Sequence, residues 1–343
     1  MGIPKECNLN IRSRYTKGEK NLITDVPGVR VGHVTIKDQK KGIYTGVTAV
    51  LPHDRNLFKE KVMGGSSIIN GFGKSIGLVQ LDELGTIEAP IMMTNTFGIG
   101  SVLNGTIRYM LEENVEIGSK AGTVNCLVTE CNDGYMNDIR GMNVTEEDAI
   151  EAIRSASYVF EEGAVGAGTG MKCMGFKGGI GSSSRIVKID NNEYTIGVLV
   201  MSNFGKPGEL VVGGINITPN EKKVCESDKG SIVMIIGTDI PLSERQLKRI
   251  AGRAVVGLVR TGSFLGNGSG DIAIAFSTAN IVPSSNVSKI LETKMLLDNS
   301  IDIAFEATAE AVEESIISSL YHAKSLIGFK KHEARSLREL LLK

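Results

Sequence analysis

Three stretches of the chain are apolar without interruption. They are residues 195–201 (TIGVLVM), 232–236 (IVMII) and 272–276 (IAIAF). A strand with one face in water alternates apolar and polar residues, whereas a strand covered on both faces has a continuous apolar run. The pattern therefore predicts three strands in the interior of a layered structure.

Four other segments have the periodicity of amphipathic helices. Ser243 and Gln246 form a capping-box pattern ahead of one of them. Thr145 precedes another, whose first turn contains acidic residues that interact favourably with the helix dipole. The helix after Ser243 has an apolar stripe of Leu247, Ile250, Ala251, Ala254 and Leu258. Two further helices are predicted from the stripes Leu103, Ile107 and Leu111, and Phe305, Ala309, Val312, Ile316 and Leu320.

Interior strands and covering helices together indicate a layered α/β fold. The length of 343 residues allows about two domains or one large α/β domain. No linker or internal repeat divides the chain. A four-layer αββα sandwich and a three-layer doubly wound sheet both fit the pattern, and periodicity alone does not choose between them.

Composition excludes several classes of protein. Lys and Arg total 38 against 39 Asp and Glu, which argues against a nucleic-acid-binding protein. The first residues lack the apolar core of a signal peptide, and no apolar run is long enough to span a membrane. Five cysteines without CxxC spacing are typical of reduced cytosolic thiols, so we expect a cytoplasmic protein. The C-terminal residues 329–343 resemble a short amphipathic tail used in packing or oligomer contacts.

Histidine is scarce. The chain has His33, His53, His322 and His332, and none lies in the long glycine-rich part between the second and the third. A Ser-His-Asp triad would need one of them to fold back. Because HxxxH and CxxC pairs are also absent, we expect no metal site.

Glycine is abundant, with 41 residues, and several glycine-rich segments suggest nucleotide binding. GFGKS (71–75) resembles the end of a P-loop, but the first glycine of that motif is replaced by Ile68. The two GxG segments lack their third glycine, at Met171 and Asp271. No nucleotide motif is complete, and we expect no cofactor.

Ser231 follows Gly230 at the first position of an apolar strand, after the polar segment ESDKG. N-terminal-nucleophile hydrolases place their nucleophile in this way. If the Gly230–Ser231 bond breaks, Ser231 gains an α-amino group with a pKa of about 7.7–8.0. That amine can act as the base for its own hydroxyl and so replace histidine. On this segment alone, an ordinary turn before a core strand is the favoured interpretation.

Six blocks in order make the chain resemble the L-aminopeptidase/D-amidase/D-esterase family, the P1 or S58 peptidases, which include the β-peptidyl aminopeptidases. The blocks are NLITDVPGVRVGHVTI (21–36), TGVTAVLP (45–52), GFGKSIGLVQLDELGTIEAPIMMTNTFGIGSVLNGT (71–106), GIGSSSR (179–185), KGSIVMIIGTDIPL (229–242) and RTGSFLGNGSGDIAIAFST (260–278). The resemblance implies an αββα sandwich with a connectivity distinct from that of classical N-terminal-nucleophile hydrolases. It implies one domain over residues 1–343, self-cleaved into chains 1–230 and 231–343 that stay associated, usually in a homo-tetramer.

The resemblance also assigns roles to individual residues. Ser231 matches the nucleophile, and Gly230–Ser231 matches the bond that is cleaved. Ser269 matches the second serine of the site, and Asp271 stands where the family has an acidic residue, which is Glu in β-peptidyl members. Two positions apart on an emerging strand, these two side chains point to one face and can hold the Ser231 amine. Without the resemblance, they also fit a locally capped turn.

Three further residues match the substrate-binding part of the family site. Asn203 matches the asparagine that donates to the oxyanion, although alone it fits a strand-terminating turn. Glu130 matches the acid that binds the substrate's ammonium group. Asn132 stands where several members have an aromatic residue, often Tyr, so the chain departs from the family there.

The sequence therefore predicts a self-processing serine aminopeptidase or amidase. It would hydrolyse the N-terminal residue from short peptides, amides or esters with a free amino group. One alternative is an acyltransferase similar to ornithine acetyltransferase, whose nucleophile is threonine. Another is a catalytically silent, uncleaved binding protein. The sequence does not indicate which side chains, or which of α-, β- and D-residues, are accepted.

Overall fold

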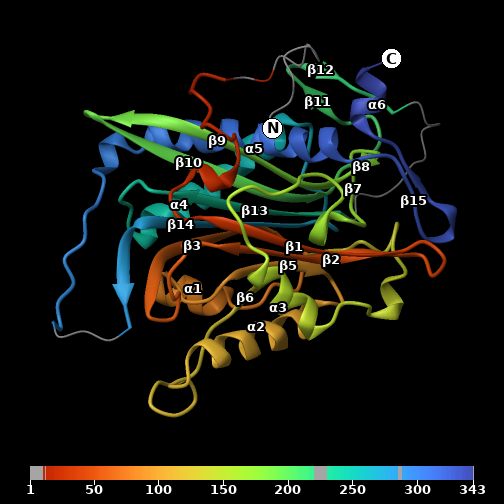
Figure 1. Ribbon diagram of the computed structural model, residues 1–343. Coiled ribbons are helices and arrows are strands. Elements are labelled where there is room, and N and C mark those ends of the chain that lie inside the picture. Colours follow the sequence, from red (N-terminus) through yellow and green to blue (C-terminus); the bar gives the residue numbers. More distant parts are fainter. Residues whose placement is uncertain (1–10, 12, 220–229, 285–287, 343) are drawn as a thin grey trace.

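The computed structural model describes residues 11, 13–219, 230–284 and 288–342. Within these residues two large sheets form (Figure 1). The strands of the larger sheet are β3 (Glu60–Gly71), β4 (Thr86–Ile87), β9 (Gly179–Ile189), β10 (Asn192–Asn203), β13 (Ser231–Thr238) and β14 (Gly270–Pro283). Those of the smaller sheet are β1 (Arg30–Asp38), β2 (Ile43–Leu51), β5 (Ile91–Asn95) and β6 (Leu127–Cys131).

Helices and short hairpins complete the described part of the chain. The α-helices are α1 (Leu78–Leu84), α2 (Ile99–Glu113), α3 (Glu146–Arg154), α4 (Glu244–Arg260), α5 (Asp302–His322) and α6 (Leu337–Leu341). The short strands are β7 (Lys172–Cys173), β8 (Phe176–Lys177), β11 (Val211–Val212), β12 (Ile215–Asn216), β15 (Leu326–Ile327) and β16 (Glu333–Ala334). The 3₁₀ turns are η2 (Ile23–Asp25), η3 (Ile139–Gly141), η4 (Gly166–Gly168), η5 (Asp298–Ser300) and η6 (Phe329–Lys331).

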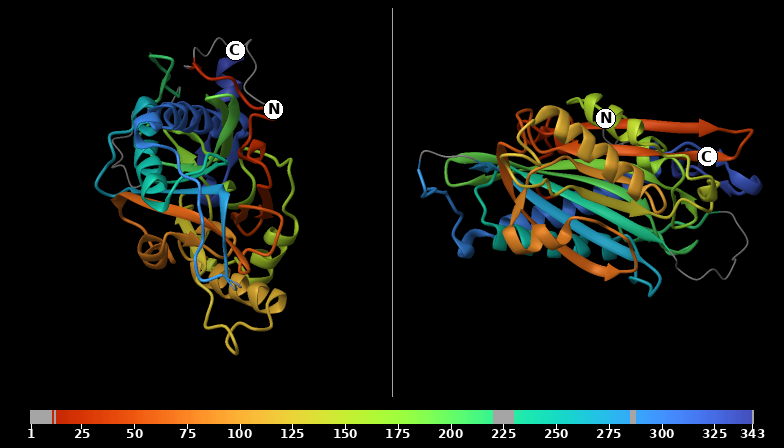
Figure 2. Two further views of the ribbon diagram at one scale, coloured as in Figure 1. Left: turned by 90° about the vertical axis from the view of Figure 1, so that its left-hand side faces the viewer. Right: turned by 90° about the horizontal axis from the view of Figure 1, so that it is seen from below.

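The two sheets stack face to face, and helices cover both outer faces. The larger sheet has the order β4-β3-β14-β13-β10-β9 and the smaller one the order β1-β2-β5-β6. Helices α4 and α5 pack on the larger sheet, whereas α2 and α3 pack on the smaller one (Figures 1 and 2). This is the four-layer αββα sandwich, so that expectation is confirmed and the three-layer alternative is wrong.

Strand β13 illustrates why the interior strands are apolar at every position. Ile232, Met234 and Ile236 belong to the core between the larger sheet and its helices. Val233 and Ile235, which point the other way, belong to the core between the two sheets. Successive side chains of a strand point to opposite faces, so burial of both faces requires an unbroken apolar run. The three predicted strands are those of β10, β13 and β14.

All four predicted helices are present. The predicted capping box of Ser243 and Gln246 begins α4. Thr145 begins α3 as expected, and there the structure adds a capping box with Asp148. The face predicted for α2 is wrong. Its buried residues are Ile99, Val102, Gly105, Thr106 and Met110, whereas Leu103 and Ile107 are partly buried and Leu111 is 43% exposed.

The cause of this difference is a close contact between two helices. A Cβ atom at Gly105 would lie 2.3 Å from the carbonyl oxygen of Glu146 in α3. Helix α3 therefore packs on a glycine and a threonine of α2, and a stripe drawn from large apolar residues does not mark that face.

Two other expectations concern the ends and the cysteines. The C-terminal tail forms β15, β16 and α6. Helix α6 packs on α5, and its Leu337 is fully buried.

The described cysteines, Cys126, Cys131 and Cys173, are buried, and none of them forms a disulfide. Cys7 and Cys225 lie outside the described residues. No helix among the described residues is long and apolar enough to cross a membrane.

A buried ionic cluster joins β9 to α5. The fully buried Arg185 donates to Glu314 at 2.7 Å and lies 3.4 Å from Glu310. Lys17 and Asn21, from the segment that precedes β1, also bind Glu314, at 2.6 and 2.9 Å. Burial alone would raise the pKa of Glu314, but Arg185 and Lys17 hold it below its ordinary value. Through Lys17 and Asn21, the cluster holds the segment that precedes β1 against α5.

We expect Arg185→Met to lower the free energy of unfolding by about 3–5 kcal/mol, because it leaves two buried carboxylates without their guanidinium partner. Arg154→Met is the matched control, since Arg154 pairs with Glu112 on the surface, where both side chains are more than half exposed. That control should change the stability by less than about 1 kcal/mol. Denaturant unfolding of the two variants measures the difference, and equal effects would contradict the role of the buried cluster.

Candidate active site

Three neighbouring strands of the larger sheet have their ends side by side. Asn203 is the last residue of β10, Ser231 is the first of β13 and Gly270 is the first of β14. The register pairs Asn203 with Ser231 across the antiparallel strands, and Ser231 with Gly270 across the parallel ones. The sheet therefore places three sequence-distant segments side by side.

Ser231 is buried, and its hydroxyl faces the carbonyl group that precedes it. Its Oγ donates to the carbonyl oxygen of Gly230 at 2.8 Å, and the main-chain N–H of Gly270 donates to the same oxygen at 3.2 Å. Two donors withdraw electron density from one carbonyl oxygen, and they make its carbon a better electrophile. A serine hydroxyl is a group that can attack such a carbon once a base removes its proton.

Gly230 and Gly270 are required because the backbone is crowded around Ser231. A Cβ atom at Gly230 would lie 2.3 Å from the carbonyl oxygen of Asn203. One at Gly270 would lie 2.5 Å from the carbonyl oxygen of Phe72 and 3.4 Å from Ser231 Oγ. Neither glycine has a positive φ angle, so their function is to leave space rather than to permit an unusual backbone conformation.

Ser269 and Asp271 flank Gly270 and form a pair. Ser269 Oγ donates to Asp271 Oδ1 at 2.6 Å, and both side chains are almost completely buried. Ser269 directly precedes β14, and its hydrogen bond shows that the two side chains lie together, as expected. The pair reaches the neighbourhood of Ser231 because Gly270, between them, is the strand partner of Ser231.

The amide group of Asn203 is held in one orientation. The main-chain N–H of Lys172 donates to its Oδ1 at 3.0 Å, and its Nδ2 donates to the carbonyl oxygen of Asn132 at 2.9 Å. A main-chain N–H can only donate, so it fixes which end of the amide is oxygen. The Nδ2 group has a second hydrogen that is available for a substrate at this strand end.

The loop that carries Lys172 is fastened by Lys177, which sequence reasoning missed. The fully buried Nζ of Lys177 donates to the carbonyl oxygens of Gly168, Met171 and Gly178, at 3.2, 2.7 and 2.7 Å. Burial lowers the pKa of Lys177 to about 7. The three hydrogen bonds close the 168–178 loop and thereby position the N–H that holds Asn203.

Glu130 enters the site from the smaller sheet. It is buried near the end of β6, accepts a hydrogen bond from the main-chain N–H of Lys74 at 3.0 Å, and accepts a second from the hydroxyl of Thr96. The neighbouring Cys131 connects the two sheets: burial raises the pKa of its thiol, and the charges of Glu130 and Asp271 raise it further. Glu130 is brought to the strand ends by the loop of Phe72 and Gly73: a Cβ atom at Gly73 would lie 3.3 Å from Glu130 Oε1, and the carbonyl oxygen of Phe72 lies against Gly270.

Asn132 contributes its main chain rather than its side chain. Its carbonyl oxygen accepts from Asn203, whereas its side chain is exposed and accepts from the N–H of Gly134 at 2.9 Å. Three residues later, Tyr135 supplies an aromatic ring, stacked on His332 at a centroid distance of 4.3 Å and 4.2 Å from Lys172 Nζ. Tyr135 lies in the same CNDGYMND segment as Asn132 and was not among the predicted site residues.

The structure therefore brings Ser231, Asn203, Ser269 and Asp271 to one strand edge, with Glu130 facing them from the other sheet. The described residues contain no group of three or more His, Cys, Asp or Glu side chains that could hold a metal ion. A hydroxyl, a hydrogen-bonded serine–aspartate pair, an oriented amide donor and a buried carboxylate can together support acyl transfer to a serine.

Comparisons with known proteins identify the family of this chain. The model of peptidase family S58 matches residues 21–334. The β-peptidyl aminopeptidase BapA of Sphingosinicella microcystinivorans is 35% identical over 97% of this chain and 89% of its own. A protein of Pyrococcus horikoshii OT3 of known structure is 50% identical, with a TM-score of 0.93 over 98% of this chain and 97% of its own. The L-aminopeptidase D-Ala-esterase/amidase of Ochrobactrum anthropi, described as a variant of the Ntn hydrolase fold, is 33% identical, with a TM-score of 0.90 over 98% and 96%.

We expect Lys177→Met to lower the free energy of unfolding by about 3 kcal/mol, because three buried carbonyl oxygens lose a charged donor. The released loop should also exchange the amide hydrogen of Lys172 faster, which hydrogen-exchange mass spectrometry of the 168–178 segment measures. Lys172→Met is the control, since it keeps the main-chain N–H and changes only the side chain over Tyr135. Equal exchange in both variants would show that Lys177 does not fasten the loop.

Proposed function

The chain belongs to peptidase family S58, and from that premise we propose that it is a self-processing serine aminopeptidase whose nucleophile is Ser231. The family and its aminopeptidase relatives identify the chain as a hydrolase. The observation that carries the finer proposal is the pair of donors on the Gly230 carbonyl oxygen, one of which is Ser231 Oγ itself at 2.8 Å.

Self-cleavage begins with attack of Ser231 Oγ on the carbonyl carbon of Gly230. The Oγ–C bond forms, the C–N bond to Ser231 breaks, and the hydroxyl proton passes to that nitrogen. The N–H of Gly270 stabilises the negative charge that develops on the Gly230 oxygen. Water then hydrolyses the ester and leaves a carboxylate on Gly230 and an α-amine on Ser231. The products are chains 1–230 and 231–343, which stay together because β13 and β14 remain hydrogen-bonded in the sheet with β10 and β3.

The new amine then serves as the base for turnover. Its ordinary pKa of about 7.7–8.0 suits proton transfer near neutral pH. We assign the Ser269–Asp271 pair the task of holding this amine next to Ser231 Oγ, which is supported by their 2.6 Å hydrogen bond and by their place on either side of Gly270. Ser231 Oγ attacks the substrate carbonyl carbon and passes its proton through the α-amine to the leaving group, which departs as an amine or an alcohol. Water then hydrolyses the ester on Ser231 and releases the acyl group as a free amino acid.

Asn203 and Glu130 bind the two ends of the reacting residue. The second N–H of Asn203 Nδ2 donates to the oxyanion, and the amide is already oriented by Lys172 and Asn132. Glu130 accepts the substrate's ammonium group, and its burial strengthens that ion pair. A free amino group on the substrate is therefore required, which makes the enzyme an aminopeptidase.

The substrate class is short peptides, amides or esters with a free N-terminal amine. The similarity to β-peptidyl aminopeptidases supports including β-residues in this class. Asp271 is one methylene shorter than the Glu of β-peptidyl members, so its distance to the Ser231 amine differs from theirs. We further propose that the processed protein is a homo-oligomer, as is usual in the family. In this proposal the acyl group is transferred to water, whereas an acyltransferase would transfer it to an amino acid. The proposed enzyme cleaves its own chain, whereas a silent binding protein would stay uncut.

Replacement of the nucleophile should abolish processing. We expect wild-type protein to give two fragments whose masses correspond to residues 1–230 and 231–343, and Ser231→Ala to give one uncut chain, because the alanine has no hydroxyl to attack Gly230. Ser101→Ala, in another Gly-Ser pair but on α2, is the control and should be cleaved like wild type. Intact-mass analysis with N-terminal sequencing measures this, and a fragment that begins elsewhere than at Ser231 would disprove the mechanism.

Truncation of the oxyanion donor should lower turnover. We expect Asn203→Ala to reduce kcat by about 10²–10³-fold with little change in KM, because the lost hydrogen bond forms mainly in the transition state. Asn132→Ala is the matched control: it keeps the carbonyl that orients Asn203 and removes a side chain that points into its own turn. Steady-state hydrolysis of an amino acid p-nitroanilide by processed protein measures both. Similar losses in the two variants would contradict the assignment.

A further inference from the structure

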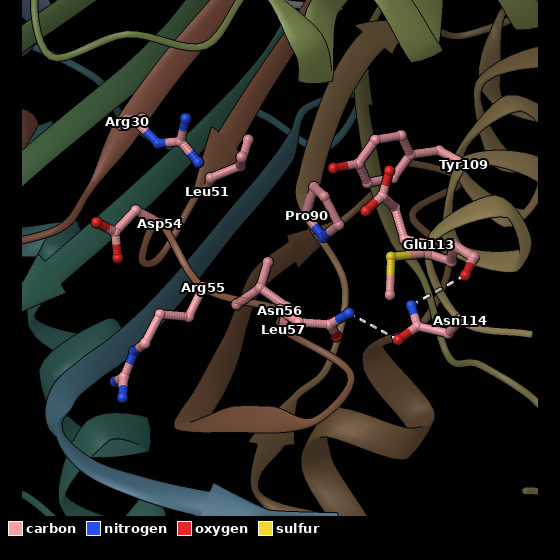
Figure 3. Close-up of a pocket in the computed structure, with 11 residues that line it drawn as sticks. Arg30, Leu51, Asp54, Arg55, Asn56, Leu57, Pro90, Tyr109, Glu113 and Asn114 are labelled. Carbon is pink, nitrogen blue, oxygen red and sulfur yellow. Dashed lines mark hydrogen bonds between the residues drawn. The ribbon is translucent and has the colours of Figure 1, made fainter. Parts of the chain in front are cut away.

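A cavity of about 150 Å³ lies at the other end of β5 from Glu130. It is enclosed by the start of β1, the loop that joins β2 to β3, Pro90 ahead of β5, and the last turn of α2 (Figure 3). Strand β5 begins at this cavity and ends beside β6 residues Glu130 and Cys131. The cavity is thus separate from the candidate active site, and nothing in the mechanism above uses it.

Arg30 supplies a positive pole without a protein counter-charge. Its Nε atom is buried and, within the described residues, has no hydrogen-bond partner. No carboxylate of the described residues forms an ion pair with its guanidinium group. A buried guanidinium nitrogen without a partner is rare in native proteins and calls for an acceptor that the protein does not supply. Figure 3 shows its side chain directed into the cavity.

Tyr109 and Glu113 supply a hydroxyl and a negative pole on the opposite side. Both come from the end of α2, and Figure 3 shows the hydroxyl and the carboxylate directed toward the side on which Arg30 lies. Burial raises the pKa of the Tyr109 hydroxyl; the charge of Glu113 raises it further, and that of Arg30 lowers it.

Two further charged residues, Asp54 and Arg55, line the cavity. Arg55 forms an ion pair with Glu60. Figure 3 shows the charged ends of both side chains directed away from the space between Arg30 and Tyr109. A simple anion bound to Arg30 would meet the repulsion of Glu113, and a simple cation bound to Glu113 would meet that of Arg30. A ligand that has a carboxylate at one end and an ammonium group at the other satisfies both. Leu51 and Pro90 form an apolar wall between the poles.

The volume limits the size of such a ligand. A cavity of about 150 Å³ holds a molecule of the size of benzene, which has six non-hydrogen atoms. Alanine and β-alanine also have six. Larger amino acids exceed the cavity unless their side chains extend toward solvent.

We propose that this pocket is a binding site for a small free amino acid, whose carboxylate binds Arg30 and whose ammonium group binds Glu113 beside the Tyr109 hydroxyl. The site rests on its own residues and does not depend on the nucleophile assigned to Ser231. If the proposed hydrolysis is also correct, the ligand belongs to the class of its products.

Titration calorimetry of the full-length Ser231→Ala protein tests this proposal without turnover. L-Alanine and β-alanine should bind saturably, with a Kd of about 1 mM or tighter for at least one of them. Propionate and ethylamine, which each have one of the two charges, should bind at least tenfold more weakly. Absence of saturable binding of both amino acids, or equal binding of propionate, would overturn the zwitterion site.

Three variants in the same background locate the ligand. Arg30→Gln and Glu113→Gln should each weaken binding at least tenfold; Glu113 is exposed on a helix end, so its variant should fold even if Arg30→Gln does not. Arg55→Gln is the matched control and should bind like the parent. If Glu130→Gln abolishes binding while Arg30→Gln and Glu113→Gln do not, the amino acid occupies the catalytic site and the proposal is wrong.

Discussion

The hydrogen-bonded position of β13 between β10 and β14 is the constraint on which the whole site depends. It alone makes Asn203, Ser231 and Gly270 neighbours, although they are far apart in the chain. A shift of the register by one residue would turn every side chain of β13 to the opposite face. Such a shift would exchange Met234 and Ile236 for Val233 and Ile235 between two fully packed cores. The apolar packing on both faces therefore fixes the place of the serine.

Close backbone approach is the second requirement, and it explains the glycines at this edge. Gly230 and Gly270 each stand where a Cβ atom would overlap a main-chain atom of a neighbouring segment. The loop that carries Phe72 presses on Gly270, and a Cβ at its next residue, Gly73, would lie 3.3 Å from Glu130 Oε1. The two halves of the site are thus brought together by backbone contacts, and larger residues at these positions would separate the Glu130 carboxylate from Ser231.

Much of this could be predicted from sequence because it depends on local patterns. Continuous apolar runs located β10, β13 and β14, and caps located α3 and α4. The αββα layering needed the resemblance to a family, since periodicity allowed two architectures. Contacts between segments that are distant in the chain could not be predicted from the sequence. Lys177 acts through carbonyl oxygens, which have no sequence signature, and the side chain of Asn132 turns away while its carbonyl oxygen contacts Asn203. Arg30 and Glu113 meet at a cavity only through the fold.

The histidines bear on the choice of catalytic base. His33 Nδ1 contacts Thr48 Oγ1 at 2.9 Å, and burial lowers its pKa to about 4. His53 Nε2 bonds the carbonyl oxygen of Glu60, and His322 Nδ1 contacts Ser318 and Glu162. His332 bonds the carbonyl oxygen of Tyr135 and stacks on its ring. All four imidazoles of the chain thus have structural partners away from Ser231 Oγ. A serine nucleophile at this edge needs another base, and an α-amine on Ser231 would arise beside its own hydroxyl without a change in the fold.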